Sequence, residues 1–203
     1  LFQSYLSMLR KKKGELVFFS FREKSKWGWG SWGCYTFLCG GKRITKHFPV
    51  ACDYYYTLFF KENILRESCY RCPYAKLPRI ADITIGDFWG VEQILPNFET
   101  HMGASLVLTN NTHGNNEFIN AVSKANEQFV HKVDLKPILE LNQTIIKPTK
   151  RPDSRDFFFK EYNRNGFLAT AKKFCRIKHM TPIIARYLPI KMKKALKNIL
   201  GRR

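Results

Sequence analysis

Two runs of strand-forming residues near the start of the chain most strongly limit its fold. "ELVFFSF" (15–21) and "CYTFLC" (34–39) are rich in aromatic and β-branched residues. A Gly-Gly pair follows at residues 40–41 and leads into "KRITKHF", which predicts a hairpin over residues 34–48. A surface helix is predicted before these runs, because apolar residues recur there at helical spacing, at Phe2, Tyr5, Leu6 and Leu9. The start of the chain therefore predicts an antiparallel meander that follows a helix.

The rest of the chain adds two strands and several helices. "ADITIGDF" (81–88) alternates apolar and polar residues, and "ASLVLTN" (104–110) predicts a strand beside it. An amphipathic helix is predicted over 112–129. Beyond a Pro-rich connection at 147–156, further helices are predicted over 154–166, 167–179 and 181–200. The predicted fold class is α+β: a mixed sheet with an antiparallel meander, flanking helices and a basic helical C-terminal extension. The predicted division is a domain over 1–146 and a linker with the extension over 147–203.

The positive charge of the chain is concentrated in this extension. The formal net charge is +19, and residues 147–203 carry 17 Lys and Arg against three Asp and Glu. Residues 182–203 form a basic amphipathic pattern that Pro189 should kink, which suits an anionic membrane surface or an acidic partner, or else a helix packed on the domain. Nucleic acid is disfavoured as a partner, because basic and aromatic residues do not alternate as in a single-strand binding face.

The beginning of the chain and its hydropathy limit its location. The chain does not start with Met and shows no signal peptide, so we expect a piece of a longer protein. It contains no apolar run of eighteen residues, and its cysteines do not resemble a disulfide framework. We therefore expect a cytoplasmic protein that is peripheral at the inner membrane face if the extension binds lipid.

Cys69 and Cys72 form a C-x-x-C pair on a predicted loop. This spacing directs two sulfurs at one metal ion or cluster corner. Three interpretations remain open from spacing alone: metal or cluster ligands, redox thiols, or incidental cysteines. Cys34, Cys39 and Cys52 lie upstream at irregular spacing and are more typical of buried strand and helix cysteines. The five histidines show no metalloprotease spacing.

The segment "ITIGDFWG" (83–90) predicts a strand that ends in a glycine-bounded turn. Gly86 and Gly90 permit a close approach of a flat or phosphate-bearing ligand, with Asp87 at the strand end. The alternative is a plain β-turn in which Asp87 bonds its own backbone and Trp89 lies in the core. Physical chemistry alone favours the plain turn.

Three longer stretches resemble a known family. "LRESCYRCPYAKLPRIADITIGDFWGVEQILP", "MGASLVLTNNTHGNNEF" and "RDFFFKEYNRNGF" resemble the C-terminal domain of the coenzyme F420 hydrogenase/dehydrogenase beta-subunit family, from about Leu1 to Phe174. The resemblance implies an iron–sulfur flavin oxidoreductase that passes electrons between FAD, a [4Fe–4S] cluster and a deazaflavin (coenzyme F420) or another redox carrier. It implies Cys69 and Cys72 as cluster ligands. It also implies a flavin contact by Thr84, Gly86, Asp87 and Ser105, and it identifies no catalytic residue.

The chain also departs from the family pattern. The family carries further cysteine motifs upstream, which this sequence lacks, although a [4Fe–4S] cluster normally takes four thiolates. We therefore expect the missing N-terminal region of the same protein as a partner, and this fragment alone to be inactive. The rival hypothesis is a zinc-binding C-x-x-C module whose basic tail binds nucleic acid or a membrane. It leaves "DITIGDFWG" unexplained.

Overall fold

The computed structural model describes the chain except for residues 27, 31, 125–129 and 176–203. The chain divides into two compact units, each with its own core. Unit 1 consists of Leu1–Glu23, Ser31–Ile64 and Pro152–Arg203, and unit 2 consists of Lys24–Gly30 and Leu65–Arg151. The chain thus leaves unit 1 after Ile64 and returns to it at Pro152. The charge pattern predicts two contiguous parts, 1–146 and 147–203. Since residues 176–203 lie outside the described residues, this division stays a prediction.

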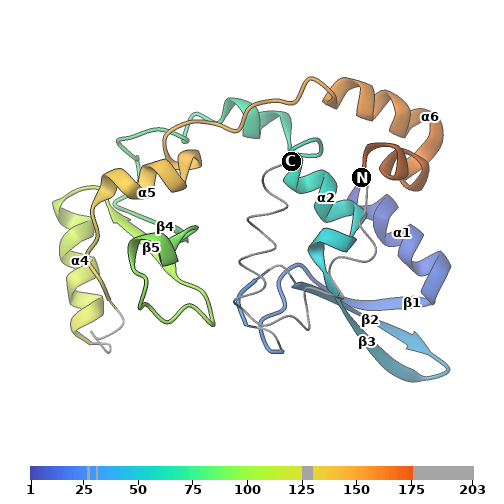
Figure 1. The fold of residues 1–203 in the computed structure, drawn as a ribbon, viewed down its shortest axis with the longest axis horizontal. Coiled ribbons are helices and arrows are strands. Elements are labelled where there is room, and N and C mark those ends of the chain that lie inside the picture. Colours follow the sequence, from blue (N-terminus) through green and yellow to red (C-terminus); the bar gives the residue numbers. More distant parts are fainter. Residues whose placement is uncertain (27, 31, 125–129, 176–203) are drawn as a thin grey trace. The chain divides into compact units, whose positions relative to one another are not determined.

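Unit 1 contains the predicted meander and its helices. Its three-stranded antiparallel sheet has the order β1 (Glu15–Ser20), β2 (Trp32–Cys39), β3 (Lys42–Pro49). Gly40 and Gly41 adopt φ of 55° and 75°, which is why glycines turn this hairpin. The helices are α1 (Phe2–Lys13), α2 (Tyr54–Phe60) and α6 (Arg155–Phe174), with a short 3-10 turn, η1, at Val50–Cys52. Figure 1 shows α1 beside the strands that follow it.

Aromatic side chains dominate the core of unit 1. Tyr5 of α1, Phe37 of β2, Leu58 of α2 and Phe158 of α6 are all buried there. The Tyr5 hydroxyl donates to the Asp53 carboxylate at 2.7 Å, and Asp53 also caps the first turn of α2. Such pairing removes the cost of burying both polar groups.

Helix α6 carries a break near its middle. Gly166 adopts φ 73° and ψ 178°, so α6 consists of two helical segments, as the sequence predicts for residues 154–166 and 167–179. Cys175 follows the second segment directly and is 4% exposed in the core of unit 1. It is thus a core residue rather than part of a separate tail helix. The helix predicted over residues 181–200, with the membrane surface proposed for 182–203, lies outside the described residues.

Unit 2 contains the second predicted pair of strands. Strands β4 (Ile83–Asp87) and β5 (Ser105–Thr109) pair antiparallel, with Asp87 opposite Ser105. The helices are α3 (Val91–Ile94), α4 (Thr112–Ser123) and α5 (Leu135–Leu141), and the 3-10 turns are η2 (Glu67–Arg71) and η4 (Gln143–Ile145). Its core is smaller than that of unit 1 and consists of Phe88, Val91, Leu106, Ile138 and Ile145 with partly buried neighbours.

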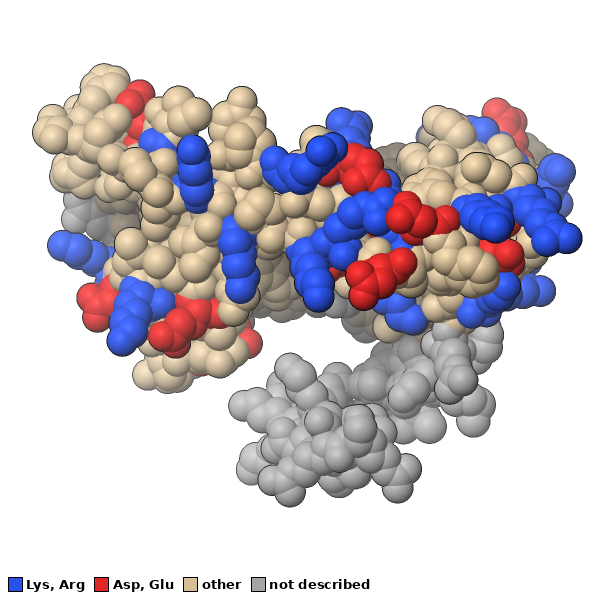
Figure 2. All heavy atoms as spheres, turned by 90° about the horizontal axis from the view of Figure 1, so that it is seen from above, with Lys and Arg blue, Asp and Glu red and all other residues tan. Residues whose placement is uncertain are grey.

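The predicted α+β class is confirmed. Within the described residues the strands form two separate antiparallel sheets instead of one mixed sheet. None of the described helices is both long and apolar enough to cross a bilayer. On the face drawn in Figure 2, Lys and Arg side chains are spread over the described surface with Asp and Glu between them.

Candidate functional site: a polar cavity in unit 2

A cavity of about 220 Å³ lies on one face of the β4–β5 pair. Thr84 and Gly86 of β4 point to the same face as their cross-strand partners Leu108 and Leu106, because alternate residues share a face. The far side is formed by the segment that follows α5. The lining residues are Arg79, Thr84, Ile85, Gly86, Asp87, Trp89, Leu106, Leu108, Asn142, Thr144 and Ile145.

Three of the four residues predicted beside a flavin line this cavity: Thr84, Gly86 and Asp87. Ser105 is exposed and pairs with Asp87 in the ladder, and it is not among the lining residues. The turn after β4 is more open than the plain-turn hypothesis expects, because Trp89 is 46% exposed rather than in the core. Three of the four predicted residues therefore gather at one hollow, and Ser105 does not line it.

The polar groups of the cavity are held in place by their neighbours. The amide of Asn110 donates to the Thr84 hydroxyl oxygen at 3.0 Å and to the carbonyl oxygen of Ala81 at 2.8 Å. Since the Thr84 oxygen already accepts a bond, its own hydrogen can be donated into the cavity. Thr84 can thus act as a hydrogen-bond donor in the cavity.

Arg79 supplies a cation with an unused donor. Its terminal nitrogen donates to the carbonyl oxygen of Tyr74. Its Nε is buried and, within the described part of the chain, has no hydrogen-bond partner. A buried donor left in this state costs about 1–3 kcal/mol, so an acceptor in the cavity would remove a penalty that the protein otherwise carries.

Asn142 fixes the turn that closes the cavity. Its side chain accepts from the backbone N–H of Trp89 at 3.2 Å and donates to the carbonyl oxygen of the same residue at 3.1 Å. Gly90, at φ 78°, then starts α3. This bidentate contact holds the end of "GDFWG" against α5. Asn142 is 6% exposed, so its Asn-x-Thr triplet marks a structural residue.

Gly86 leaves room in the cavity for a ligand. A Cβ placed on Gly86 would meet no atom within 4 Å. Its backbone does not require glycine either, because its φ is not positive. By contrast, a Cβ on Gly103 would collide with the Trp29 ring, and one on Gly114 would collide with the backbone of Asp82. Gly103 and Gly114 thus serve packing, whereas Gly86 borders open space.

Cys69 and Cys72 lie on η2 and directly after it. Both are half-buried and neither forms a disulfide. Among the described residues, the one group of three metal-ligating side chains consists of Glu23, Cys34 and His47 and includes neither of them. Both thiols are therefore free and partly accessible, and the described residues place them in no group of three metal-ligating side chains.

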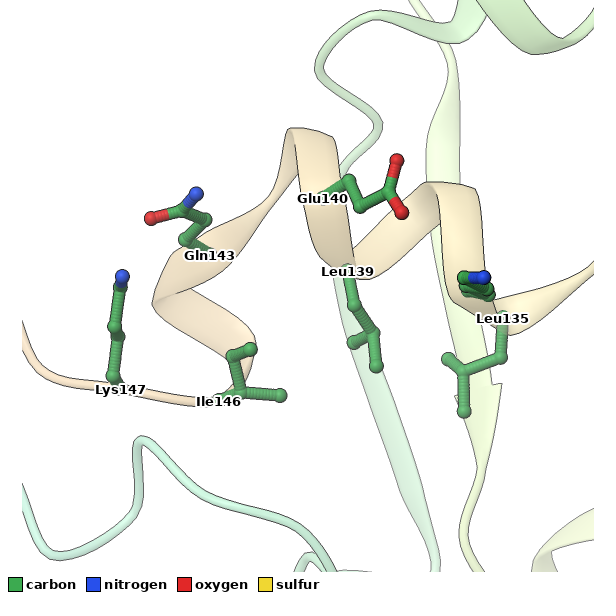
Figure 3. Close-up of a pocket in the computed structure, with 7 residues that line it drawn as sticks. Leu135, Leu139, Glu140, Gln143, Ile146 and Lys147 are labelled. Carbon is green, nitrogen blue, oxygen red and sulfur yellow. The ribbon is translucent and has the colours of Figure 1, made fainter.

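A second hollow, of about 500 Å³, runs along α5 and η4. Figure 3 shows Leu135, Leu139 and Ile146 pointing to the same side of this segment, while Glu140 points away from them. All of its lining residues come from one stretch, 135–147. Among the described residues, no polar groups from elements distant in sequence meet in this hollow. The hollow therefore lacks the few converging polar groups typical of ligand sites.

Arg79 and Asn142 are not predictable from the sequence. Arg79 lies between two predicted features, and Asn142 matches only a chance glycosylation triplet. Asn142 bonds Trp89 across 53 positions, and the burial of the Arg79 Nε depends on the folded surroundings, so no local spacing signals either residue. A buried unpaired donor is visible only after folding.

Comparison with known families agrees with these observations. A family model for the C terminus of the beta subunit of coenzyme F420 hydrogenase/dehydrogenase matches residues 23–134, which is more than half of the chain. The chain belongs to this family. The match covers the C-x-x-C pair, both strands of the cavity and the sheet strands β2 and β3. No curated protein and no solved structure matches the chain significantly. The family comprises subunits of oxidoreductases, so the chain is related to redox subunits.

Proposed function

We propose that the cavity on β4–β5 holds the ring end of a flavin or deazaflavin, and that this chain is part of an iron–sulfur flavin oxidoreductase. The observation that carries this proposal is the buried, unpartnered Nε of Arg79 in a cavity that Thr84, Gly86 and Asp87 also line. Family membership supports the redox class. The ligand chemistry follows from the groups that line the cavity.

The size and the donors of the cavity suit a flat heteroaromatic ring. Whole ligands occupy pockets of about 300–1,000 Å³. A cavity of about 220 Å³ therefore suits one ring system, with the rest of a dinucleotide lying outside it. The pyrimidine edge of a flavin or deazaflavin carries carbonyl oxygens, which match the N–H of Arg79 and the O–H of Thr84. The open space at Gly86 and the apolar Leu106 and Leu108 would lie against the ring face.

The residues of the cavity would position and polarise such a ring. The guanidinium of Arg79 places a fixed positive charge next to the ring edge, where it favours negative charge that develops on reduction. Asn142 and Asn110 keep Trp89 and Thr84 in place through their side-chain amides. When bound, a flavin supplies the exchange of electron pairs with a small carrier and of single electrons with a cluster.

We also propose that Cys69 and Cys72 ligate an iron–sulfur cluster together with ligands from another part of the protein. Two half-buried free thiols in C-x-x-C spacing support this role.

FAD, a [4Fe–4S] cluster and coenzyme F420 remain the proposed cofactors. The partners proposed are the missing N-terminal region and a redox partner, in a cytoplasmic protein. Iron and sulfide analysis of the full-length protein with Cys69→Ser or Cys72→Ser tests this, because unchanged iron in both would contradict it.

The cavity is tested by FAD binding to Gly86→Val and Arg79→Met. Valine would fill the open space at Gly86, and Met removes the cation while keeping the length of the side chain. We expect the FAD dissociation constant to rise about tenfold or more in each, since a hydrogen bond to a charged group contributes about 1.5–3 kcal/mol. Equilibrium dialysis with FAD gives the constants.

Two matched variants control for the fold. Gly30→Val makes the same change at another glycine of unit 2 that has open space around it, and Arg66→Met removes an exposed arginine outside the cavity. Both should bind FAD like the unaltered chain. Unchanged affinity in Gly86→Val and Arg79→Met, or an unaltered chain that binds no FAD, would remove the cavity from consideration.

A further inference from the structure

Unit 1 contains a group of three metal-ligating side chains that the redox proposal does not use. Glu23, Cys34 and His47 each offer one ligand atom, and these atoms all lie within 4.8 Å of one another. The carboxylate, thiol and imidazole come from three successive segments of the meander. The group lies apart in sequence from the C-x-x-C pair and belongs to the other unit.

The backbone of the sheet holds these three residues together. Cys34 of β2 and His47 of β3 are direct cross-strand partners, so their side chains stand next to each other on one face. On the same face, two residues further along, the hydroxyls of Thr36 and Thr45 are 2.9 Å apart. Glu23 follows β1, and its N–H donates to the carbonyl oxygen of Trp32 at 3.0 Å. The arrangement is therefore fixed by ladder and backbone hydrogen bonds.

The spacing of the ligand atoms is close to that around a tetrahedral zinc ion. Bond lengths of about 2.0–2.3 Å place tetrahedral ligand atoms about 3.3–3.7 Å apart. The Cys34 sulfur already lies 3.3 Å from a carboxylate oxygen of Glu23. All three ligand atoms lie within 4.8 Å of one another, so only a small contraction separates them from this spacing.

A second observation points to an absent ligand. The Nδ1 atom of His47 is buried and, among the residues that the structure describes, has no hydrogen-bond partner. Cys34 is only 2% exposed, which places the sulfur out of bulk water. A buried imidazole nitrogen next to a buried thiol and a carboxylate carries an uncompensated cost that a bound cation would remove.

We propose that Glu23, Cys34 and His47 form a site for a divalent cation of the zinc type. A thiolate disfavours Mg²⁺ and Ca²⁺, whereas one sulfur, one nitrogen and one oxygen suit Zn²⁺. Three protein ligands leave the fourth tetrahedral position for water. The ion would tie the end of β1 to the β2–β3 hairpin.

Binding exchanges a proton for the ion. Burial, together with the hydrogen bond to the Glu23 carboxylate, raises the pKa of the Cys34 thiol to about 11. Without the ion the sulfur therefore keeps its proton and shares it with Glu23. A cation that binds here forms a bond to sulfur while the thiol proton leaves to solvent.

Co²⁺ titration of the full chain tests the site, because Co²⁺ bound to thiolate absorbs strongly in the near ultraviolet. We expect one equivalent to bind with this absorption and to be displaced by Zn²⁺. Cys34→Ser should abolish the absorption. His47→Gln should weaken binding by more than about 100-fold, since even residues that only orient a metal ligand contribute 10–100-fold.

Two further variants separate this site from the other cysteines. Cys39→Ser changes an exposed cysteine of the same strand, and Cys69→Ser/Cys72→Ser removes the proposed cluster ligands. Both should keep the Co²⁺ absorption. Absorption that survives in Cys34→Ser, that disappears only in Cys69→Ser/Cys72→Ser, or that is missing in the unaltered chain would overturn the proposal. His47→Gln leaves Cys34 in place, so it tests the site even if Cys34→Ser unfolds the chain.

Discussion

The two units use their side chains differently. Unit 1 packs rings from α1, β1, α2 and α6 into one core, and Tyr5 alone contacts four other rings, those of Phe2, Phe19, Tyr55 and Phe167. Unit 2 buries fewer and smaller apolar side chains and keeps a cavity beside its strand pair. Within unit 1 the buried polar groups mostly pair with one another, as Arg155 does with the carbonyl oxygen of Asn63 at 2.5 Å.

This difference separates a unit with a dense aromatic core from a unit that keeps open space beside its strand pair. A dense ring core stabilises unit 1, because each buried aromatic side chain removes a large apolar area from water. In unit 2 the unpartnered Nε of Arg79 and the open space at Gly86 are unfavourable for packing, and the proposed ligand would occupy both. His47 is the exception in unit 1, and it is the residue on which the proposed cation site depends.

The largest expected effect is in the core of unit 1. Phe158 is 0% exposed, so Phe158→Ala should lower the free energy of unfolding of unit 1 by about 3–5 kcal/mol. Hydrogen exchange measured by mass spectrometry should show faster exchange in β2 and unchanged exchange in β5. Phe157→Ala is the matched control, because the adjacent ring is 49% exposed and should cost about 1 kcal/mol or less. Equal acceleration in both units would show that they unfold together.

A smaller effect is expected at the turn of unit 2. Asn142→Ala removes the side chain that bonds both backbone groups of Trp89, which should cost about 1–3 kcal/mol. Exchange should then accelerate in β4 and α3 and remain slow in β2. Glu140→Ala, an exposed change two residues earlier, should leave all rates unaltered. Protection of β4 that survives in Asn142→Ala would mean that this contact does not hold the turn.

The smallest effect concerns pH and unit 1. Burial raises the pKa of Asp53, although hydrogen bonds from Tyr5 and the backbone of Tyr56 oppose this shift. Because the folded state binds the Asp53 proton more tightly than the unfolded state, protonation of Asp53 stabilises the fold at low pH. This contribution is lost as the pH rises from about 4, the usual Asp pKa, through the raised pKa of Asp53. Asp53→Asn keeps an oxygen acceptor and cannot ionise, so its melting temperature should fall less over this range. If the melting temperatures of both proteins changed equally with pH, Asp53 would make no contribution.

Much of the fold could be predicted because it depends on local patterns. The Gly-Gly turn, the two strand pairs and the break of α6 at Gly166 follow from turn chemistry and from the periodicity of apolar residues. The interruption of unit 1 by residues 65–151 could not be predicted, since it depends on which apolar faces pack against each other.

The site was predictable only in part. Thr84, Gly86 and Asp87 lie in one motif, and the structure brings all three to the cavity. Ser105 pairs with Asp87 in the neighbouring strand but is not among the lining residues. The roles of Cys69 and Cys72 stay a prediction, since the other ligands of a cluster are not among their described neighbours.

The sequence by itself determined the fold class, the family and that Thr84, Gly86 and Asp87 lie together, because these depend on contiguous motifs. Only the tertiary structure decided that Arg79 and Asn142 complete the cavity and that Glu23, Cys34 and His47 meet at one point. Cys34 and His47 become neighbours through the register of β2 and β3, and Glu23 joins them through a backbone hydrogen bond. Strand register and backbone pairing bring together residues that are eleven to twenty-four positions apart along the chain, and no local spacing rule can encode such a meeting.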